Sequence, residues 1–288
     1  MKKQEDMALM KARSYRSVLT TGLRLYTENF RRLFKASWQM ALLYALSAGA
    51  LGTLATIKIP EITLTLTQQL ATYQGVFQET LQQYWLILLE LLGLMLLAIV
   101  IMALADAPIL SKLKEHKETG TISTPPHWLT ASPHLMGRTL KGTLFTLPFC
   151  IVLLPLFPLL LPFSYVVMKY VMDERQKYWS SLWHEYCQGM RYWGFLFLVF
   201  FVSLLLVVLA SFVITLPANI LQLANQAALT GQLTGDPLGM PSYMTSLTFI
   251  TFTFCNFICF YVYQVILVHN YYIYGSIETK EHEKNTLH

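Results

Sequence analysis

Two polar residues within apolar parts of the sequence are candidates for binding chemistry. Glu90 is a carboxylate inside the apolar run 84–105, and an ionisable side chain within a membrane segment is a functional candidate by default. It follows Trp85 by about one and a half helical turns, so it can also reach water from just inside an interface. Asn256 lies in the apolar run 246–269, where hydrogen bonding between helices explains it equally well.

Two prolines complete the candidate pathway. Pro155 and Pro158 lie in the charge-free stretch 142–168, and each removes a backbone donor and crowds the preceding turn. Unpaired backbone at membrane depth must be covered by protein or face a wet cavity, and transporters often build binding sites at such broken helices. A proline-kinked packing element without a site is the alternative. A functional interpretation has Glu90 binding a proton or cation near these prolines.

No motif in the sequence identifies a reaction. It lacks the HExxH zinc motif, the GxSxG nucleophile elbow and the phosphate-binding GxxxxGK[ST] loop. The 7 histidines are scattered without ligand spacing, and the 4 cysteines form no CxxC pair. We therefore expect no enzyme activity, no catalytic residue, no metal site and no cofactor.

The composition indicates a membrane protein with several spans. Hydrophobic residues make up 55% of the 288 residues, charged residues only 13%, and the mean hydropathy is +0.45. A span needs about 20 apolar residues, which places four spans at 37–57, 84–105, 193–216 and 246–269. This composition excludes a soluble enzyme, a nucleic-acid-binding protein and a disordered chain.

The Lys and Arg residues decide how the stretch 142–168 is placed. If it doubles back as a hairpin, 20 of the 21 basic residues fall on one side of the membrane; if it crosses once, 14 do. The first division agrees far better with the positive-inside rule. We therefore expect an all-α protein with six membrane segments: four full spans and a short hairpin that turns near 154–158. Both termini are then cytoplasmic, in the inner membrane of a bacterium.

Basic amphipathic segments precede the membrane hairpins and are typical of helices that lie at the headgroup boundary. The cations expected to contact anionic lipid headgroups are Arg13, Arg16, Arg24, Arg31, Arg32, Lys35, Arg138, Lys141 and Arg191. Such segments can equally serve topology alone. Membrane lipids are thus the expected partners, a membrane-protein partner is left open, and nucleic acid is not expected.

We expect a single integral membrane domain, 1–288, with a threefold plan. Its parts are an interfacial helix 12–35, a first hairpin 37–105, a second interfacial helix with the broken hairpin at 127–168, a third interfacial helix with its hairpin at 174–269, and a cytoplasmic tail 270–288. Outer loops with short amphipathic helices are expected at 58–84 and 217–245, and a solvated charged linker at 111–131.

Small residues in the first span predict close helix packing. Ala45, Gly49 and Thr53 recur at four-residue intervals, which lets a second helix approach closely. The partner helix can be internal or can belong to a second chain, and internal packing is favoured because other membrane segments are available.

Both ends of the chain suggest a family. The opening GLRLYTENFRRLFKASWQMALLYAL and the ending YYIYGSIETKEHEK resemble those of the YciC-like bacterial proteins and of the membrane domains found beside some glycerophosphodiester phosphodiesterases. The resemblance covers about a third of the chain, and its motifs are short. It implies a six-span inner-membrane protein. It does not imply phosphodiesterase activity, because that chemistry belongs to a separate catalytic barrel.

From these features we expect a non-catalytic scaffold or an accessory factor of envelope assembly or membrane homeostasis. The alternative is a small transporter or lipid-handling protein that uses Glu90 and the hairpin at 142–168.

Overall fold

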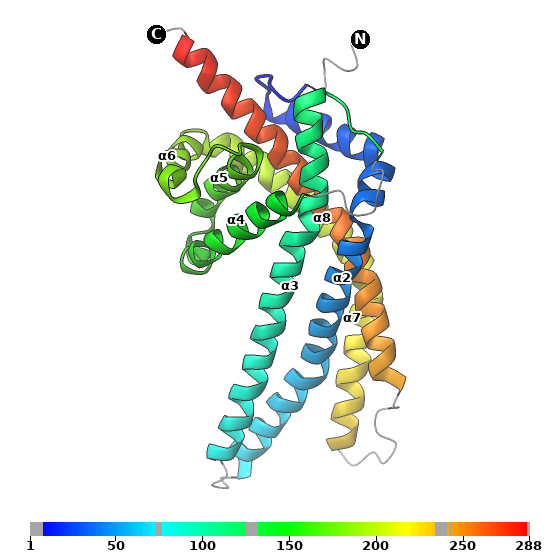
Figure 1. Ribbon diagram of the computed structural model, residues 1–288. Coiled ribbons are helices and arrows are strands. Elements are labelled where there is room, and N and C mark those ends of the chain that lie inside the picture. Colours follow the sequence, from blue (N-terminus) through cyan, green and yellow to red (C-terminus); the bar gives the residue numbers. More distant parts are fainter. Residues whose placement is uncertain (1–7, 73–76, 125–131, 234–240, 242, 287–288) are drawn as a thin grey trace. The chain divides into compact units, whose positions relative to one another are not determined.

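The described part of the chain is predominantly helical (Figure 1). The computed structural model describes residues 8–72, 77–124, 132–233, 241 and 243–286, and no strand occurs among them. In chain order the helices are α2 Tyr15–Thr72, α3 Phe77–Thr119, α4 Pro133–Val152, the 3-10 helix η1 Leu154–Leu160, α5 Leu161–Met172, α6 Tyr178–Arg191, α7 Trp193–Leu233 and α8 Tyr243–Thr286. The all-α fold expected from the sequence is confirmed for these residues.

Among the described residues, five stretches are long and apolar enough to cross a membrane, which supports the predicted membrane protein. They are Tyr15–Pro60, Tyr84–Thr119, Pro155–Met172, Trp193–Ala228 and Tyr243–Thr286. Large apolar side chains on them are exposed, among them Trp85, Leu89 and Phe212 at 61% to 66%. Exposed apolar surface of this extent is expected against lipid. Pro155–Met172 differs, because 56% of its apolar window is buried.

The four long helices extend well beyond the predicted spans. The predicted interfacial helix 12–35 and the predicted span 37–57 belong to one helix, because Ala36 and Ser37 continue α2 without interruption. The prediction of a solvated loop was wrong for 111–119, because these residues belong to α3. Most of 58–84, which was predicted as an outer loop with a short amphipathic helix, is helical. Helices propagate cooperatively through Gln-, Glu- and Lys-rich sequence, so they do not end where the apolar run ends. Residues 125–131 of the predicted linker and residues 234–240 of the predicted outer loop 217–245 lie outside the described residues.

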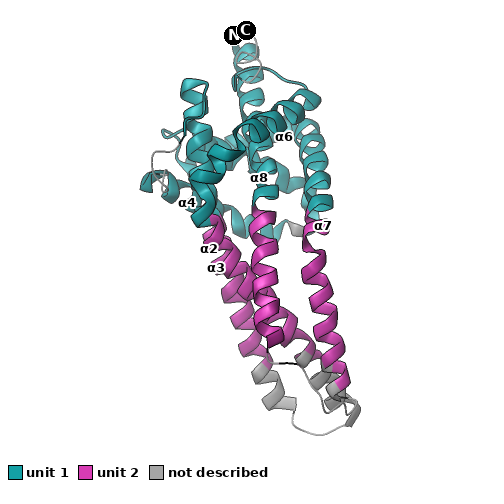
Figure 2. Cartoon of the chain, turned by 90° about the vertical axis from the view of Figure 1, so that its right-hand side faces the viewer, with its two compact units in different colours: residues 1–40, 103–210, 261–288 teal, residues 41–102, 211–260 magenta. Residues whose placement is uncertain are grey.

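The chain forms two compact units (Figure 2). Unit 1 comprises 1–40, 103–210 and 261–288, and unit 2 comprises 41–102 and 211–260. Helices α2, α3, α7 and α8 each contribute residues to both units, whereas α4, η1, α5 and α6 lie wholly in unit 1. The N-terminal and C-terminal segments therefore belong to the same unit.

Within unit 1 the proline-rich segment doubles back. Ser132 caps α4 by accepting a hydrogen bond from the Leu135 amide at 3.2 Å, and Pro133 occupies the first turn. The chain turns through η1, where Leu156 has non-helical angles of φ −110° and ψ 49°. Helix α5 then returns along α4, so that Arg138 near the start of α4 reaches the carbonyls at the end of α5.

The N-terminal segment packs on the C-terminal part of α8, also within unit 1. The Arg13 guanidinium lies 4.9 Å from the centroid of the Tyr272 ring and donates to the Leu9 carbonyl at 3.1 Å. At Gly275 the approach is so close that a Cβ atom would lie 2.5 Å from the Leu9 carbonyl oxygen. These contacts hold the N-terminal segment against the C-terminal helix.

Within unit 2 the small residues of α2 pack against α8, as their spacing predicts. A Cβ atom on Gly49 would lie 2.2 Å from Thr253 Oγ1, and one on Gly52 would lie 2.6 Å from the Phe252 ring. The helix that approaches this face is therefore internal to the chain.

Candidate functional site

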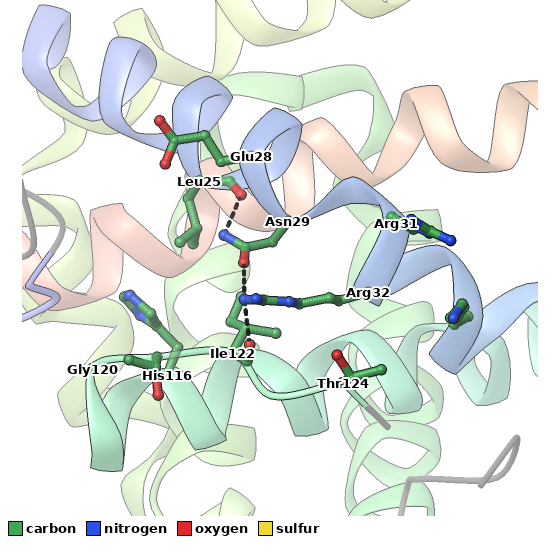
Figure 3. Close-up of a pocket in the computed structure, with 11 residues that line it drawn as sticks. Leu25, Glu28, Asn29, Arg31, Arg32, His116, Gly120, Ile122 and Thr124 are labelled. Carbon is green, nitrogen blue, oxygen red and sulfur yellow. Dashed lines mark hydrogen bonds between the residues drawn. The ribbon is translucent and has the colours of Figure 1, made fainter. Parts of the chain in front are cut away.

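A basic cavity of about 660 Å³ lies in unit 1 between the N-terminal part of α2 and the segment that follows α3 (Figure 3). Its lining residues are Leu25, Glu28, Asn29, Arg31, Arg32 and Lys35 from α2, His116 from α3, and Gly120, Thr121, Ile122 and Thr124 from the following segment. The α2 residues gather on one side because positions three, four and seven residues apart share a helix face. We call this space the basic cavity.

Gly120 positions the second wall of the basic cavity. It has φ +72°, a left-handed angle that favours glycine, and its amide donates to the His116 carbonyl at 2.9 Å. This ends α3 and sends 121–124 past α2. The segment thereby brings the Ile122 carbonyl within reach of Arg32.

Arg32 is fixed by a chain of hydrogen bonds. Its Nη1 atom donates to Asn29 Oδ1 at 3.1 Å and to the Ile122 carbonyl at 2.7 Å, and Asn29 Nδ2 donates to the Leu25 carbonyl at 3.0 Å (Figure 3). Asn29 itself is 9% exposed. The guanidinium is therefore held in one orientation by neutral groups, so its charge is not cancelled by these partners.

Two further cations, Arg31 and Lys35, line the basic cavity. Arg31 and Lys35 are exposed, and within the described residues neither forms an ion pair or a side-chain hydrogen bond. The one carboxylate of the lining, Glu28, is paired with Arg24 at 3.1 Å. The lining thus carries three permanent positive charges against one negative charge. Such a cavity attracts an anion, and guanidinium groups bind phosphate or carboxylate oxygens with directed hydrogen bonds.

His116 forms the buried end of the basic cavity. It is 3% exposed, and its Nδ1 atom lies 2.9 Å from the Tyr271 hydroxyl. This contact ties α3 to α8 and holds the imidazole ring in place.

The residues of the candidate pathway are divided between the two units. Glu90 and Asn256 belong to unit 2, whereas Pro155 and Pro158 belong to unit 1 and are exposed on η1. Glu90 is exposed on α3, and Asn256 Nδ2 donates to the Phe252 carbonyl of its own helix at 2.8 Å. The pathway stays a prediction.

The cations predicted to contact lipid headgroups separate into three groups. Arg13 and Arg138 are buried, at 4% and 8% exposure, and donate to backbone carbonyls. Three others have partners within the protein: Arg24 pairs with Glu28, Arg32 bonds Asn29 and Ile122, and Arg191 pairs with Glu281 at 3.1 Å. Exposed cations without an ion pair among the described residues are Arg16, Arg31, Lys35 and Lys141. Only this last group offers its full hydrogen-bonding capacity to a ligand.

A partly buried ion cluster in unit 1 was not predicted from the sequence. Lys169 Nζ of α5 lies 2.7 Å from Glu185 Oε2 of α6 and 2.7 Å from Glu278 Oε1 of α8. Tyr165 OH also donates to Glu278. The three charges are far apart in sequence, so only the packing of the helices reveals the pair partners. The available signal was the isolated Lys169 at the end of an apolar run.

No group of three His, Cys, Asp or Glu side chains in the described part of the chain is arranged to hold a metal ion.

Comparison of the chain with protein-family models, with curated proteins and with solved structures finds no match. The resemblance of the chain ends to the YciC-like group therefore stays a prediction.

Proposed function

We propose that the protein is a non-catalytic integral protein of a bacterial inner membrane that serves as a scaffold or accessory factor in envelope assembly or membrane homeostasis. The observation that carries this proposal is the division of charge between the units. Of the 21 Lys and Arg residues in the sequence, 20 fall within the ranges of unit 1, and only Lys58 falls within those of unit 2. The positive-inside rule then assigns unit 1, with both termini, to the cytoplasmic side.

In this proposal the membrane contains six segments. Four belong to α2, α3, α7 and α8, and two are the arms of the broken hairpin formed by α4 and α5. An even number of crossings agrees with the packing of the N-terminal segment on α8 in the same unit. The hairpin is re-entrant, because 20 residues of α4 and 12 of α5 give lengths of about 30 Å and 18 Å at 1.5 Å per residue, and α5 is too short to cross alone.

Exposed aromatic residues support a position of α6 at the headgroup boundary. Trp179 and Trp183 are 61% and 75% exposed, one helical turn apart. Tryptophan is enriched at membrane interfaces because its ring is apolar and its N–H is polar. Tyr186 of α6 donates its hydroxyl hydrogen to the Leu159 carbonyl of η1 at 3.1 Å, which joins this helix to the broken hairpin.

The buried polar groups of unit 1 favour a structural role. Arg13, Arg138 and His269 each hydrogen-bond with other groups of the chain. Reactive groups in active sites are instead directed toward a space that a substrate can enter.

The alternative of lipid handling has one observation in its favour. A largely apolar cavity of about 320 Å³ lies within unit 1 between the arms of the hairpin, α3 and α8, and Cys150, Phe163 and Asn270 line it. A lipid chain is the kind of ligand that such a lining accepts.

One pair of measurements tests the scaffold proposal against transport. The protein is purified from bacterial membranes in lipid nanodiscs for mass-spectrometric analysis of its partners, and it is also reconstituted in liposomes for proton and lipid flux. A scaffold predicts a partner in fixed stoichiometry and flux equal to that of empty liposomes. Absence of any partner, together with flux that Glu90→Gln abolishes, would replace it with the transporter.

A further inference from the structure

We propose that the basic cavity is a saturable binding site for a phosphate group, carried either by an anionic lipid headgroup or by a small soluble phosphate. The proposed function gives this region a cytoplasmic position beside anionic lipid but assigns it no specific ligand. The inference rests on that proposed orientation only for the lipid source of the phosphate.

Three cations are gathered in the basic cavity. Arg31, Arg32 and Lys35 line one cavity of about 660 Å³. Three like charges gathered in one cavity repel one another, and a bound anion relieves that repulsion. Ion pairing with nearby carboxylates is the usual remedy on a protein surface, but among the described residues Arg31 and Lys35 have none.

The Arg32 guanidinium is pre-organised for binding. The bonds from Arg32 to Asn29 Oδ1 and to the Ile122 carbonyl hold its guanidinium on the cavity wall before any ligand arrives. A guanidinium has five N–H donors, so donors other than those two bonds stay available for ligand oxygens. A group held in place in advance loses less conformational entropy on binding than a freely moving one.

The wall of the basic cavity opposite α2 offers further hydrogen-bond donors and leaves space for a ligand. The segment 120–124 contributes Thr121 and Thr124, whose hydroxyl groups can donate to phosphate oxygens, and Gly120, which has no side chain to obstruct a ligand. Guanidinium, ammonium and hydroxyl donors around one cavity match the three or four oxygens of a phosphate group better than the two of a carboxylate.

The basic cavity lies close along α2 to an exposed tryptophan, Trp38. Trp38, which is 39% exposed, follows Lys35 by three residues, or about 4.5 Å along the helix axis. An exposed tryptophan before an apolar run is typical of the headgroup level. A lipid phosphate at that level would be within reach of Lys35.

The test uses the full-length protein in neutral detergent and isothermal titration calorimetry. The probes are inorganic phosphate, dihexanoyl phosphatidic acid and dihexanoyl phosphatidylcholine. The main variant is Arg31→Gln/Lys35→Gln, which removes two cations without removing a bond within the described protein. The matched control, Arg175→Gln/Lys177→Gln, removes the same charge from exposed positions outside the cavity lining.

We expect the main variant to bind phosphatidic acid about tenfold or more weakly than the wild type, and the control variant to stay within about twofold. Arg32→Lys keeps the charge but loses the fixed guanidinium, and we expect it to weaken binding as well. Unchanged thermal unfolding midpoints identify the variants that keep their fold.

Comparison of the probes identifies the source of the phosphate. Phosphatidic acid binding more tightly than inorganic phosphate indicates a lipid headgroup, whereas equal affinities indicate a soluble phosphate. No saturable binding to the wild type, or equal losses in the main and control variants, would overturn the proposed site. Because binding in detergent does not depend on membrane orientation, failure of this test leaves the proposed function standing, and the reverse also holds.

Discussion

The guanidinium of Arg138 lies over the ring of Tyr170, 4.0 Å from its centroid, and its Nε atom donates to the Tyr170 carbonyl at 3.1 Å. The same side chain reaches the carbonyls of Asp173 at 2.8 Å and of Glu174 and Gln176 at 3.2 Å. One arginine near the start of α4 thus donates to carbonyls at the end of α5 and in the turn that follows it. It closes the open end of the hairpin.

Replacing Arg138 with Gln should therefore open the hairpin end. We expect the free energy of unfolding to fall by about 3 kcal/mol, because one buried carbonyl and three partly buried ones lose a charged donor. Thermal or denaturant unfolding of the purified protein in detergent measures it. Arg175→Gln removes an exposed cation nearby and should change stability by less than about 0.5 kcal/mol. Equal effects of the two substitutions would show that Arg138 does not hold the hairpin.

Gly22 marks a close contact between α2 and α8 in unit 1. A Cβ atom there would lie 2.4 Å from Cδ2 of His269, a ring that is 1% exposed and bonded to Ser203. We expect Gly22→Ala to destabilise the protein by about 1–3 kcal/mol, since a fixed ring must move. Gly137→Ala is the control: nothing lies within 4 Å of its Cβ position in α4, and alanine should stabilise that helix by up to about 1 kcal/mol. A tolerated Gly22→Ala would contradict the helix contact.

Lys169 should stabilise the protein through its ion pairs with Glu185 and Glu278. With Lys169→Met, Glu185 and Glu278 keep their charges without the shared ammonium, and we expect a loss of about 3 kcal/mol in detergent unfolding. Adding Glu185→Gln and Glu278→Gln should restore part of that loss, since the two uncompensated carboxylate charges disappear, and that of Glu185 is buried. A triple variant no more stable than Lys169→Met would argue against the cluster. Lys177→Met, at an exposed position, serves as the control.

Some of this architecture can be predicted from sequence because its causes are local. A span needs an unbroken apolar run, so four long helices contain the predicted spans. Small residues around Gly49 predict close packing because the space they leave does not depend on the rest of the fold. The helix ends were missed, because polar residues such as those of 111–119 continue a helix as readily as they form a loop.

The candidate site could not be predicted from the sequence, because its residues come together only in the folded chain. Arg13 and Arg138 have the same helical spacing as their exposed neighbours, and nothing in the sequence distinguishes them as buried. The basic cavity exists because Gly120 turns the chain back toward α2, which places Ile122 beside Arg32. Sequence spacing gave the charged face of α2 but not the wall opposite it.

The most direct test of the central claim, that the chain doubles back and keeps 169–192 on the side of both termini, uses the exposed thiol of Cys187. A variant with Cys150, Cys255 and Cys259 changed to Ser is treated with a membrane-impermeant maleimide in intact spheroplasts and in inside-out vesicles. Cys187→Ser in that background is the blank, and Pro241→Cys in the blank reports the opposite face. We predict that Cys187 reacts only in inside-out vesicles and the substituted position 241 only in spheroplasts; reaction of Cys187 in spheroplasts would contradict the hairpin and the orientation derived from it.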